Sequence, residues 1–347
     1  MTDTAPIRPD ERFDEDRVER YLHGHLGELI GSGPVDFEQF PGGAANLTYL
    51  ARTARGEFVL RRAPLGPVAK HGHDMEREYR VLSRLWTGYP PAPQAYHYCD
   101  DPTVMGKPFF VMERRSGLVI RQTWPAALGG DADVLRHVTE GVVDGLSALH
   151  RVDVEAVGLE DLGRPEGFVQ RQVDGWRDRW EAAKTRDVPD MDRSAEILGS
   201  AVPEPQAATL LHNDYKLDNA MVDGEGSLVA VFDWDMATRG DPLADLGTLL
   251  GYWADPDDPV YAVLVGHAVP LTPVMTKREV VDRYSSSTGF DVDRLAFYEG
   301  LALFRIAVIL EQIYARYASG QTKDDRFALF EPAAPILARS ALTALER

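Results

Sequence analysis

The chain has 347 residues, of which 44% are hydrophobic and 27% are charged, and these proportions are those of ordinary globular domains. The formal net charge of −18 repels phosphate backbones, so we expect no nucleic-acid partner. The N-terminal residues lack the apolar core of a signal peptide, and the most apolar late segment, 301–314, is interrupted by Arg305 and Glu311, so we expect no membrane partner.

The first third of the chain predicts a small, sheet-rich region with two helices. Amphipathic periodicity favours the helices, and alternating apolar residues favour strands joined by a turn. The predicted helices cover 14–30 and 74–86, and the predicted strands cover 47–52, 57–61 and 109–113. Cys99 is the only cysteine and permits no internal disulfide, which suits the reducing cytoplasm where we expect the protein to act.

The remainder of the chain predicts a mostly helical region with short β-type runs around two loops. Apolar residues recur at helical spacing in three long segments, and a turn signal at Asp223 and Gly224 separates two of the β-type runs. The predicted helical segments cover 135–149, 169–180 and 297–313, and the β-type runs cover 209–211, 221–222 and 228–232.

The two loops of the helical region carry the residues on which a functional prediction rests. His212, Asp214 and Asn219 follow the pattern H-x-D-x-x-x-x-N of a protein-kinase catalytic loop, in which the Asp is the base and the Asn a metal ligand. Asp233 follows an apolar run, 19 positions after Asp214. Phosphoryl transfer needs a carboxylate that orients the acceptor hydroxyl and oxygen ligands for Mg²⁺. We therefore expect Asp214 to act as the catalytic base and Asn219 and Asp233 to bind Mg²⁺.

Each of these residues also has a structural alternative. Asp and Asn in polar loops usually form turns and caps, and only their combination in this order favours the catalytic interpretation. A histidine in the position of His212 more often braces the loop by hydrogen bonding than acts as a base. Lys216 either contacts the transferred phosphate as a catalytic residue or lies in solvent, and both alternatives stay open.

The sheet-rich region contains residue types that a nucleotide site needs. The loop that holds Gly43 and Asn46 precedes a predicted strand, and it either folds over phosphates through its backbone N–H groups or forms a plain turn. Arg61 ends the next predicted strand, and Glu78 on the following helix can pair with it, as the lysine and glutamate of kinases do. The expected cofactor-binding residues of this region are Gly43, Asn46, Arg61 and Glu78.

These motifs resemble those of the aminoglycoside phosphotransferase and choline kinase-like superfamily. The segments FVLRRAP, MEREYRVLSRLW, RQVDGWRDRW and DWDMATRGDPLADLGTLLGYW are most similar to the kinase-like domains associated with acyl-CoA dehydrogenases and to their free-standing bacterial relatives. The similarity runs from about Gly42 to Trp253. Asn213 and Arg61 depart from the Gly and Lys that are usual in the superfamily.

The resemblance implies an α+β, bilobed protein-kinase-like fold with a small β-rich N-lobe and a larger, mostly helical C-lobe. The N-lobe is expected at residues 1–115, with an N-terminal helix, an antiparallel sheet, an αC-type helix and the nucleotide site. The C-lobe is expected at 116–347, with the catalytic loop and a substrate-binding insert. The resemblance also implies that the linker from Glu113 to Arg115 hydrogen-bonds adenine through its backbone, and that ATP and Mg²⁺ are the cofactors.

The expected function is ATP- and Mg²⁺-dependent transfer of a phosphate to a hydroxyl group of a small-molecule partner. The acceptor is a hydroxyacid or hydroxyacyl compound, an aminoglycoside or another small alcohol, and the sequence leaves these open. The insert contains Arg171, Arg177 and Arg179. If these arginines face the site, an anionic or partly apolar acceptor is favoured. If Trp176 and Trp180 simply pack on the core, the arginines lie in solvent.

Two other classes of protein fit the same residues less well. A catalytically inactive, nucleotide-binding pseudokinase is suggested by the departures at Asn213 and Arg61. A protein–protein interaction module on a kinase fold would leave the combination of Asp214, Asn219 and Asp233 without a purpose.

Overall fold

The structure is a computed structural model, and it describes residues 3–41, 46–65, 74–121, 123–253, 257–264, 274–322 and 324–347. The chain divides into two compact units. Unit 1 comprises Met1–Ser116, Glu155–Leu159 and Ala230–Ala237, and unit 2 comprises Gly117–Val154, Glu160–Val229 and Thr238–Arg347. The sequence-based boundary at 115/116 did not anticipate that two short later segments belong to unit 1. A sheet dominates unit 1 and helices dominate unit 2, and this confirms the expected α+β class.

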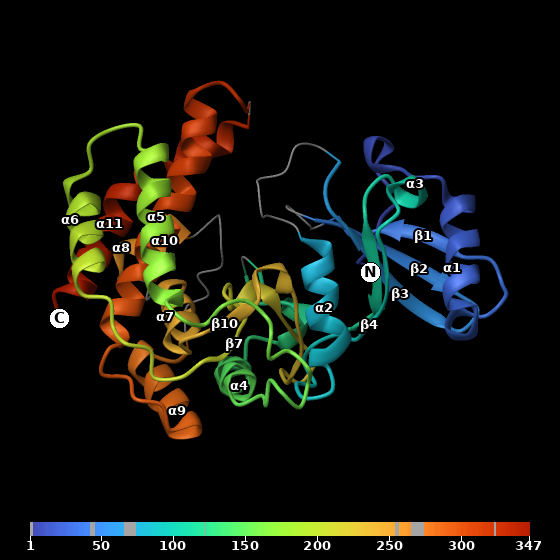
Figure 1. Ribbon diagram of the computed structural model, residues 1–347, viewed down its shortest axis with the longest axis horizontal. Coiled ribbons are helices and arrows are strands. Elements are labelled where there is room, and N and C mark those ends of the chain that lie inside the picture. The colour runs from blue at the N-terminus through green and yellow to red at the C-terminus, as the bar shows by residue number, and fades with distance from the viewer. Residues whose placement is uncertain are drawn as a thin grey trace. The chain divides into compact units, whose positions relative to one another are not determined.

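Unit 1 is built on an antiparallel sheet with the strand order β1-β2-β3-β5-β4 (Figure 1). Its strands are β1 (Asp36–Gln39), β2 (Leu47–Thr53), β3 (Gly56–Arg62), β4 (Ala95–Cys99) and β5 (Phe109–Glu113). Its helices are α1 (Glu15–Ile30), α2 (Met75–Leu85) and α3 (Pro102–Met105). Side chains alternate between the faces of a strand, so Leu60 and Arg61 of β3 point to opposite faces of the sheet. The face of Leu60 packs against α1, whereas Arg61 bonds to a residue of α2.

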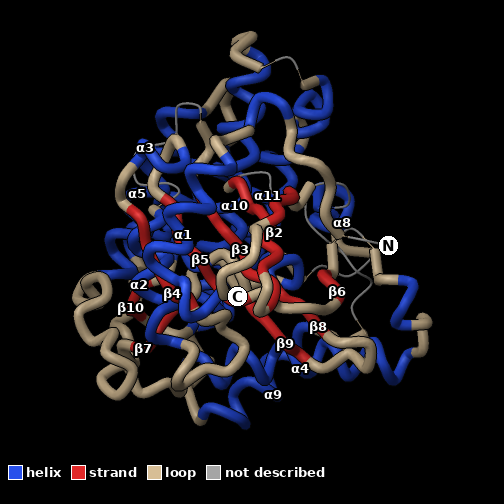
Figure 2. Tube along the Cα trace, turned by 90° about the vertical axis from the view of Figure 1, so that its right-hand side faces the viewer, coloured by secondary structure: helices blue, strands red, loops and turns tan. Residues whose placement is uncertain are grey.

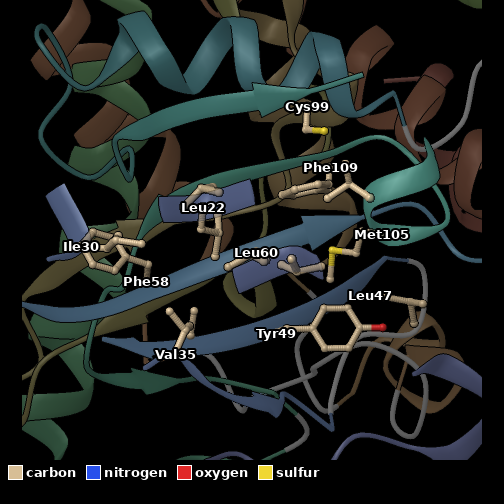
Figure 3. Close-up of a cluster of buried hydrophobic side chains, with 14 of the residues drawn as sticks. Leu22, Ile30, Val35, Leu47, Tyr49, Phe58, Leu60, Cys99, Met105 and Phe109 are labelled. Atoms are coloured by element: carbon tan, nitrogen blue, oxygen red, sulfur yellow. The ribbon is translucent and has the colours of Figure 1, made fainter. Parts of the chain in front are cut away.

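The sheet face under α1 forms the hydrophobic core of unit 1, which Figure 3 shows in close-up. Leu22 of α1 packs with Tyr49, Leu60 and Phe109 from three strands in this core. Arg62 is buried in the same core, where it donates to the Tyr49 hydroxyl at 2.7 Å and to backbone carbonyl groups of other segments. These bonds offset the cost of burying a guanidinium group, and they fix the end of β3.

Unit 2 consists mainly of helices, with short strands at the loops that connect them (Figure 2). Its helices are α4 (Ala132–His150), α5 (Phe168–Ala183), α6 (Pro189–Ser200), α7 (Leu243–Gly251), α8 (Pro259–Leu264), α9 (Lys277–Thr288), α10 (Leu295–Ala318) and α11 (Ala333–Leu345). Its strands are β6 (Leu118–Val119), β7 (Thr209–Leu211), β8 (Ala220–Val222), β10 (Thr238–Gly240) and the first part of β9 (Leu228–Val231). β7 pairs antiparallel with β10, and β6 pairs antiparallel with β8.

The long helix α10 is the centre of unit 2, and it packs against α7, α11 and α5 (Figure 1). The approach of α7 is close because Gly247 lacks a side chain: a Cβ atom there would lie 2.6 Å from the backbone oxygen of Tyr298. Glu311 of α10 is fully buried and accepts hydrogen bonds from the backbone N–H and the hydroxyl of Thr185, at 3.1 and 2.6 Å. Among the residues that the structure describes, no helix is both long enough and apolar enough to cross a membrane.

Candidate active site

The loop between β7 and β8 of unit 2, residues 212–219 (the Asp214 loop), brings together three of the residues predicted from the sequence. The loop ends in a 3₁₀ turn, Leu217–Asn219, that leads directly into β8. Asn219 Nδ2 donates to the Asp214 carbonyl at 2.9 Å and lies 3.3 Å from Asp214 Oδ2. Lys216 Nζ lies 3.0 Å from the same Oδ2. One carboxylate is thus held between an amide and an ammonium group of its own loop.

The buried side chain of Asp245, in α7, hydrogen-bonds the backbone at the start of the Asp214 loop. Its Oδ2 accepts the N–H of His212 and its Oδ1 accepts the N–H of Asn213, both at 2.7 Å. His150 Nε2 lies 3.3 Å from Oδ2, and its Nδ1 lies 2.6 Å from the hydroxyl of Tyr284. Because Asp245 is fully buried, these bonds are shielded from water and hold the loop backbone firmly.

Asn213 occupies the position where the superfamily usually has Gly, and it adopts a left-handed conformation with φ of 66°. Asparagine tolerates this region better than most residues, so the loop keeps the path that a glycine would give it. His212 braces the loop as expected, because its Nδ1 accepts the N–H of Asp214 at 3.2 Å. The backbone on both sides of Asp214 is therefore fixed by hydrogen bonds.

The charges around Asp214 keep its carboxylate ionised. Burial by itself raises the pKa of Asp214, but the positive charges of Lys216 and Arg305 outweigh burial and lower it below the usual value. Burial by itself lowers the pKa of Lys216, but the neighbouring Tyr252, Asp214 and Asp218 outweigh burial and raise this pKa above its usual value. The Lys216 ammonium lies 5.0 Å from the centre of the Tyr252 ring, within cation–π range. Lys216 is thus paired and mostly buried, and the alternative that placed it in solvent is wrong.

A second group of predicted residues meets in unit 1, on the sheet face that α2 covers. Arg61 Nε donates to Glu78 Oε2 at 2.9 Å, and Arg61 Nη2 forms an ion pair with Asp233 Oδ1. Asp233 belongs to unit 1 through the segment 230–237, whereas Asp214 and Asn219 belong to unit 2. The structure therefore brings together Arg61, Glu78 and Asp233 within one unit.

The segment that carries Asp233 is fixed to the rest of unit 1 by backbone contacts. The N–H of Val231 donates to the carbonyl of Pro91 at 2.8 Å, and Arg77 of α2 donates to the carbonyl of Ala237 at 3.1 Å. Between these points, the buried ring of Trp234 packs edge-on against Tyr89. Asp233 itself has a left-handed backbone with φ of 71°, a conformation in which Asp and Asn are enriched, and its side chain remains partly exposed.

The guanidinium of Arg61 is shared by three carboxylates, those of Glu78, Asp233 and Asp235. Burial tends to lower the pKa of Arg61, but the three negative charges raise it, so the guanidinium stays charged. Burial raises the pKa of Glu78 to about 7, with Arg61 opposing the rise and the two aspartates adding to it.

The remaining predicted cofactor residues have varied surroundings. Asn46 is buried, and neither polar atom of its side-chain amide has a hydrogen-bond partner in the part of the chain that the structure describes. Gly43 lies outside the described residues. Glu113 ends β5, and its carboxylate accepts from the N–H of Gln94 at 3.2 Å and lies 3.0 Å from Arg115 Nε. The side chains of Glu113 and Arg115 are thus occupied within unit 1.

The tryptophans and the arginines of the helical insert have different surroundings. Trp176 and Trp180 of α5 are buried, so they pack in the core of unit 2. Arg171, Arg177 and Arg179 are exposed. Arg305 of α10 approaches the Asp214 loop, although in the sequence it stands out only as an interruption of an apolar run. A signal was available: a charged residue in the middle of a buried helix needs a polar partner elsewhere in the fold.

Each of the two groups contains residue types that suit a nucleotide or Mg²⁺. Mg²⁺ prefers hard oxygen ligands, which Asp233 and Asn219 can provide. The guanidinium of Arg61 matches the charge and the geometry of phosphate oxygens. A buried amide with no partner among the described residues, as at Asn46, carries a desolvation cost that a bound polar ligand can offset.

Comparison with known sequences gives one family and several long relatives. The sequence pattern of the phosphotransferase enzyme family matches residues 36–277. Acyl-CoA dehydrogenase family member 10 of Mus musculus is 31% identical over 324 residues, which cover 92% of this chain and 30% of that protein. Acyl-CoA dehydrogenase family member 11 of Homo sapiens is 28% identical over 355 residues, which cover 100% of this chain and 45% of that protein. The chain thus spans less than half the length of these relatives.

Comparison with solved structures supports the same fold. A candidate aminoglycoside phosphotransferase of Ralstonia eutropha is 28% identical with a TM-score of 0.81, and the match covers 96% of this chain and 99% of that one. A thermostable mutant of aminoglycoside phosphotransferase APH(4)-Ia, in a ternary complex with AMP-PNP and hygromycin B, is 18% identical with a TM-score of 0.59, covering 93% and 98%. A choline/ethanolamine kinase family protein of Mesorhizobium loti has 17% identity and a TM-score of 0.59, covering 95% and 98%. The predicted resemblance and kinase-like fold are confirmed.

Proposed function

The chain belongs to the phosphotransferase enzyme family, and we propose that it transfers the γ-phosphoryl group of MgATP to a hydroxyl group of a small molecule. The observation that carries this proposal is the Asp214 loop. It presents an ionised carboxylate flanked by Lys216 and Asn219, on a backbone held by the buried Asp245. This is the arrangement that phosphoryl transfer to an alcohol requires of a protein.

In this proposal, Asp214 orients the acceptor hydroxyl and takes up its proton at a carboxylate oxygen. The pKa of Asp214 lies below its usual value, because Lys216 and Arg305 outweigh the opposing effect of burial. The carboxylate is therefore ionised at neutral pH and ready to accept a hydrogen bond. Lys216 lies close enough to Asp214 to place a positive charge beside the phosphoryl group as it is transferred.

In this proposal, the residues that bind the cofactor have the roles expected from the sequence. Asn219 and Asp233 provide oxygen ligands for Mg²⁺, and Arg61, oriented by Glu78, binds phosphate oxygens. When bound, MgATP supplies the phosphoryl group and the metal charge that stabilises it in transfer. Adenine binding is assigned to the backbone from Glu113 to Arg115, and phosphate binding to the loop of Gly43 and Asn46. Among the described residues the buried amide of Asn46 has no hydrogen-bond partner, which supports a polar ligand at that loop.

For the acceptor, we propose a hydroxyacid or a hydroxyacyl thioester. This chain aligns over nearly its whole length with part of acyl-CoA dehydrogenase family members, which favours an acyl compound. The cations near Asp214, Lys216 and Arg305, also favour an acceptor that carries a negative charge. We further propose that the protein acts in the cytoplasm, where its single cysteine stays reduced.

An aminoglycoside is the second candidate acceptor, because the related solved structures include aminoglycoside phosphotransferases. The pseudokinase alternative has less support. Asn213 keeps the left-handed conformation that a glycine would adopt, and Arg61 makes the ion pair with Glu78 that a lysine makes in kinases.

The experiment that tests this proposal measures ADP release from MgATP in the presence of parallel sets of acceptors. The sets are hydroxyacids, hydroxyacyl thioesters, aminoglycosides, choline and simple sugars. We expect acceptor-dependent ADP release with a hydroxyacid or hydroxyacyl thioester, and its loss when EDTA removes Mg²⁺. Turnover with aminoglycosides alone would refute the proposed acceptor class, and release that is independent of every acceptor would refute the proposed transfer.

A further inference from the structure

Arg305 is a charged residue in the interior of unit 2. It lies in α10, whose neighbouring residues are mainly apolar, and only 8% of its surface is exposed. Taking a guanidinium out of water is costly unless its donors find partners. The contacts of Arg305 therefore indicate why α10 carries a cation at this position.

These contacts converge on the Asp214 loop. Arg305 Nη1 donates to the backbone carbonyl of Asn213 at 2.8 Å and lies 3.4 Å from the side-chain oxygen of the same residue. Arg305 Nη2 lies 4.0 Å from Asp214 Oδ1. The carbonyl of Asn213 belongs to the peptide group that joins it to Asp214. Arg305 thus contacts both the backbone immediately before the carboxylate and the carboxylate itself.

Trp176 of α5 supports the guanidinium from another element. The centre of its ring lies 5.4 Å from Arg305 Cζ, which is within cation–π range, and its side chain is buried. A planar guanidinium stacks on an aromatic ring and still presents its N–H groups along its edge. The ring can therefore restrict the orientation of Arg305 without occupying its donors.

Asp245 and Arg305 bind the same turn, one as a hydrogen-bond acceptor and the other as a donor. Asp245 accepts the N–H groups of His212 and Asn213, and Arg305 donates to the carbonyl of Asn213. With both contacts in place, the peptide groups on each side of Asn213 are fixed, which favours its left-handed conformation. If Arg305 is removed, the peptide before Asp214 loses this partner of its carbonyl and keeps the longer bond from its N–H to His212 Nδ1 at 3.2 Å, so it gains freedom to rotate although the contacts of Asp245 remain.

We propose that Arg305, supported by Trp176, is a positioning residue that fixes the Asn213–Asp214 peptide and thereby aims the Asp214 carboxylate. This inference rests on the proposed role of Asp214 as the base. It assigns to α10 and α5 a part in catalysis in addition to packing. It also predicts that loss of Arg305 lowers turnover far more than it weakens ATP binding, because the groups assigned to ATP do not include it.

The test compares Arg305→Met and Arg305→Gln with the matched control Arg316→Met, which changes an exposed arginine of the same helix. Met fills a similar volume without donors, and Gln retains a single neutral donor. Hydrogen exchange of peptides that cover residues 210–219 reports on the loop without any acceptor. Steady-state kinetics with the acceptor found by screening report kcat and the KM for ATP.

We expect Arg305→Met to lower kcat by about 10- to 100-fold while the KM for ATP stays within about threefold. The 210–219 peptides should exchange about 10-fold faster or more, with α11 unchanged, since a charge-assisted hydrogen bond is lost. Arg305→Gln should give smaller changes of both kinds, and Arg316→Met should match the wild type. If Arg305→Met does not fold, Arg305→Gln carries the same test.

A folded variant whose loop exchange and kcat both stay within twofold of the wild type would overturn the inference. Faster exchange spread evenly over all helices, with kcat lowered only in proportion to the folded fraction, would also overturn it. If the wild type phosphorylates no acceptor, the proposed function fails, but the exchange measurement still decides whether Arg305 holds the loop.

Discussion

Asp245→Asn is the substitution that most directly examines how the Asp214 loop is held. Asp245 is fully buried, and its two oxygens each accept a backbone N–H at 2.7 Å. Hydrogen bonds to a charged group contribute about 1.5–3 kcal/mol each, and a buried N–H left without a partner costs about 1–3 kcal/mol. Asparagine keeps one acceptor oxygen and turns an NH₂ group toward the other N–H. Because removing a buried charge offsets part of this loss, we expect the free energy of unfolding to fall by about 2–4 kcal/mol.

The matched control is Asp241→Asn. Asp241 is also buried, and it accepts the backbone N–H groups of Gln206 and Leu243 at 3.0 and 2.9 Å, but neither belongs to the Asp214 loop. Urea unfolding followed by circular dichroism measures the stability of both variants, and ADP release measures kcat per folded molecule. Both variants should lose similar stability, and only Asp245→Asn should also lower kcat, by about 10-fold or more.

Two results would refute this reasoning. If Asp245→Asn left the free energy of unfolding within 0.5 kcal/mol of the wild type, a value typical of neutral surface changes, the two bonds would not stabilise the fold as calculated. If Asp241→Asn lowered kcat as much as Asp245→Asn did, the effect on activity would be general and would not pass through the loop.

Three further predictions concern backbone conformation, ionisation and packing. Asn213→Gly should keep kcat within about threefold, whereas Asn213→Ala should lower the free energy of unfolding by about 1–2 kcal/mol, since alanine is strained at φ of 66°; equal stability of the two variants would contradict this. Burial raises the folded-state pKa of Glu78 to about 7 from 4.5, so the unfolded chain releases this proton first as pH rises. The free energy of unfolding should therefore fall between about pH 4.5 and 7, by on the order of 3 kcal/mol, and urea titrations should show that Glu78→Gln removes this slope, whereas an unchanged slope would assign it to other groups. Gly247→Ala should destabilise the protein by about 1–3 kcal/mol because the added Cβ meets the Tyr298 backbone, whereas Gly24→Ala, where nothing lies within 4 Å of the added Cβ, should be neutral or stabilising. Thermal unfolding measures both variants, and a Gly24→Ala protein less stable than Gly247→Ala would contradict this.

The elements that the sequence predicted correctly are those with strong local patterns. The helix expected over 14–30 is α1, Glu15–Ile30, and the side chain of Asp14 caps its N-terminus. The strands expected over 47–52 and 57–61 are β2 and β3, each one or two residues longer. In these segments the periodicity of apolar residues and the capping or turn residues agree, so local chemistry is sufficient.

The elements that the sequence missed depend on partners that are distant along the chain. β10 contains Arg239 and Gly240, which give no strand signal, and it forms because it pairs with β7. α9 is an exception, because the capping box of Thr276 and Glu279 is a local signal for its start. Short strands gain stability only from pairing, so their own residues cannot specify them.

The candidate site also contains contacts that a local motif predicts and contacts between residues that are distant along the chain. The spacing of Asp214 and Asn219 is local, and the structure places these residues in contact. The contact of Arg305 with Asn213 joins residues 92 positions apart, and no local pattern specifies it. Motif spacing can therefore indicate the groups that perform the chemistry, whereas the groups that hold them in place emerge only from the fold.

The most direct test of the central claim is a single-turnover measurement of γ-phosphoryl transfer from labelled MgATP to the acceptor by the wild type, Asp214→Asn and the control Asp178→Asn, which changes an exposed residue of α5. The account predicts that Asp214→Asn lowers the transfer rate by on the order of 10²–10⁴-fold while ATP affinity is retained, and that Asp178→Asn has no effect. A folded Asp214→Asn enzyme that transfers phosphate at the wild-type rate would contradict it.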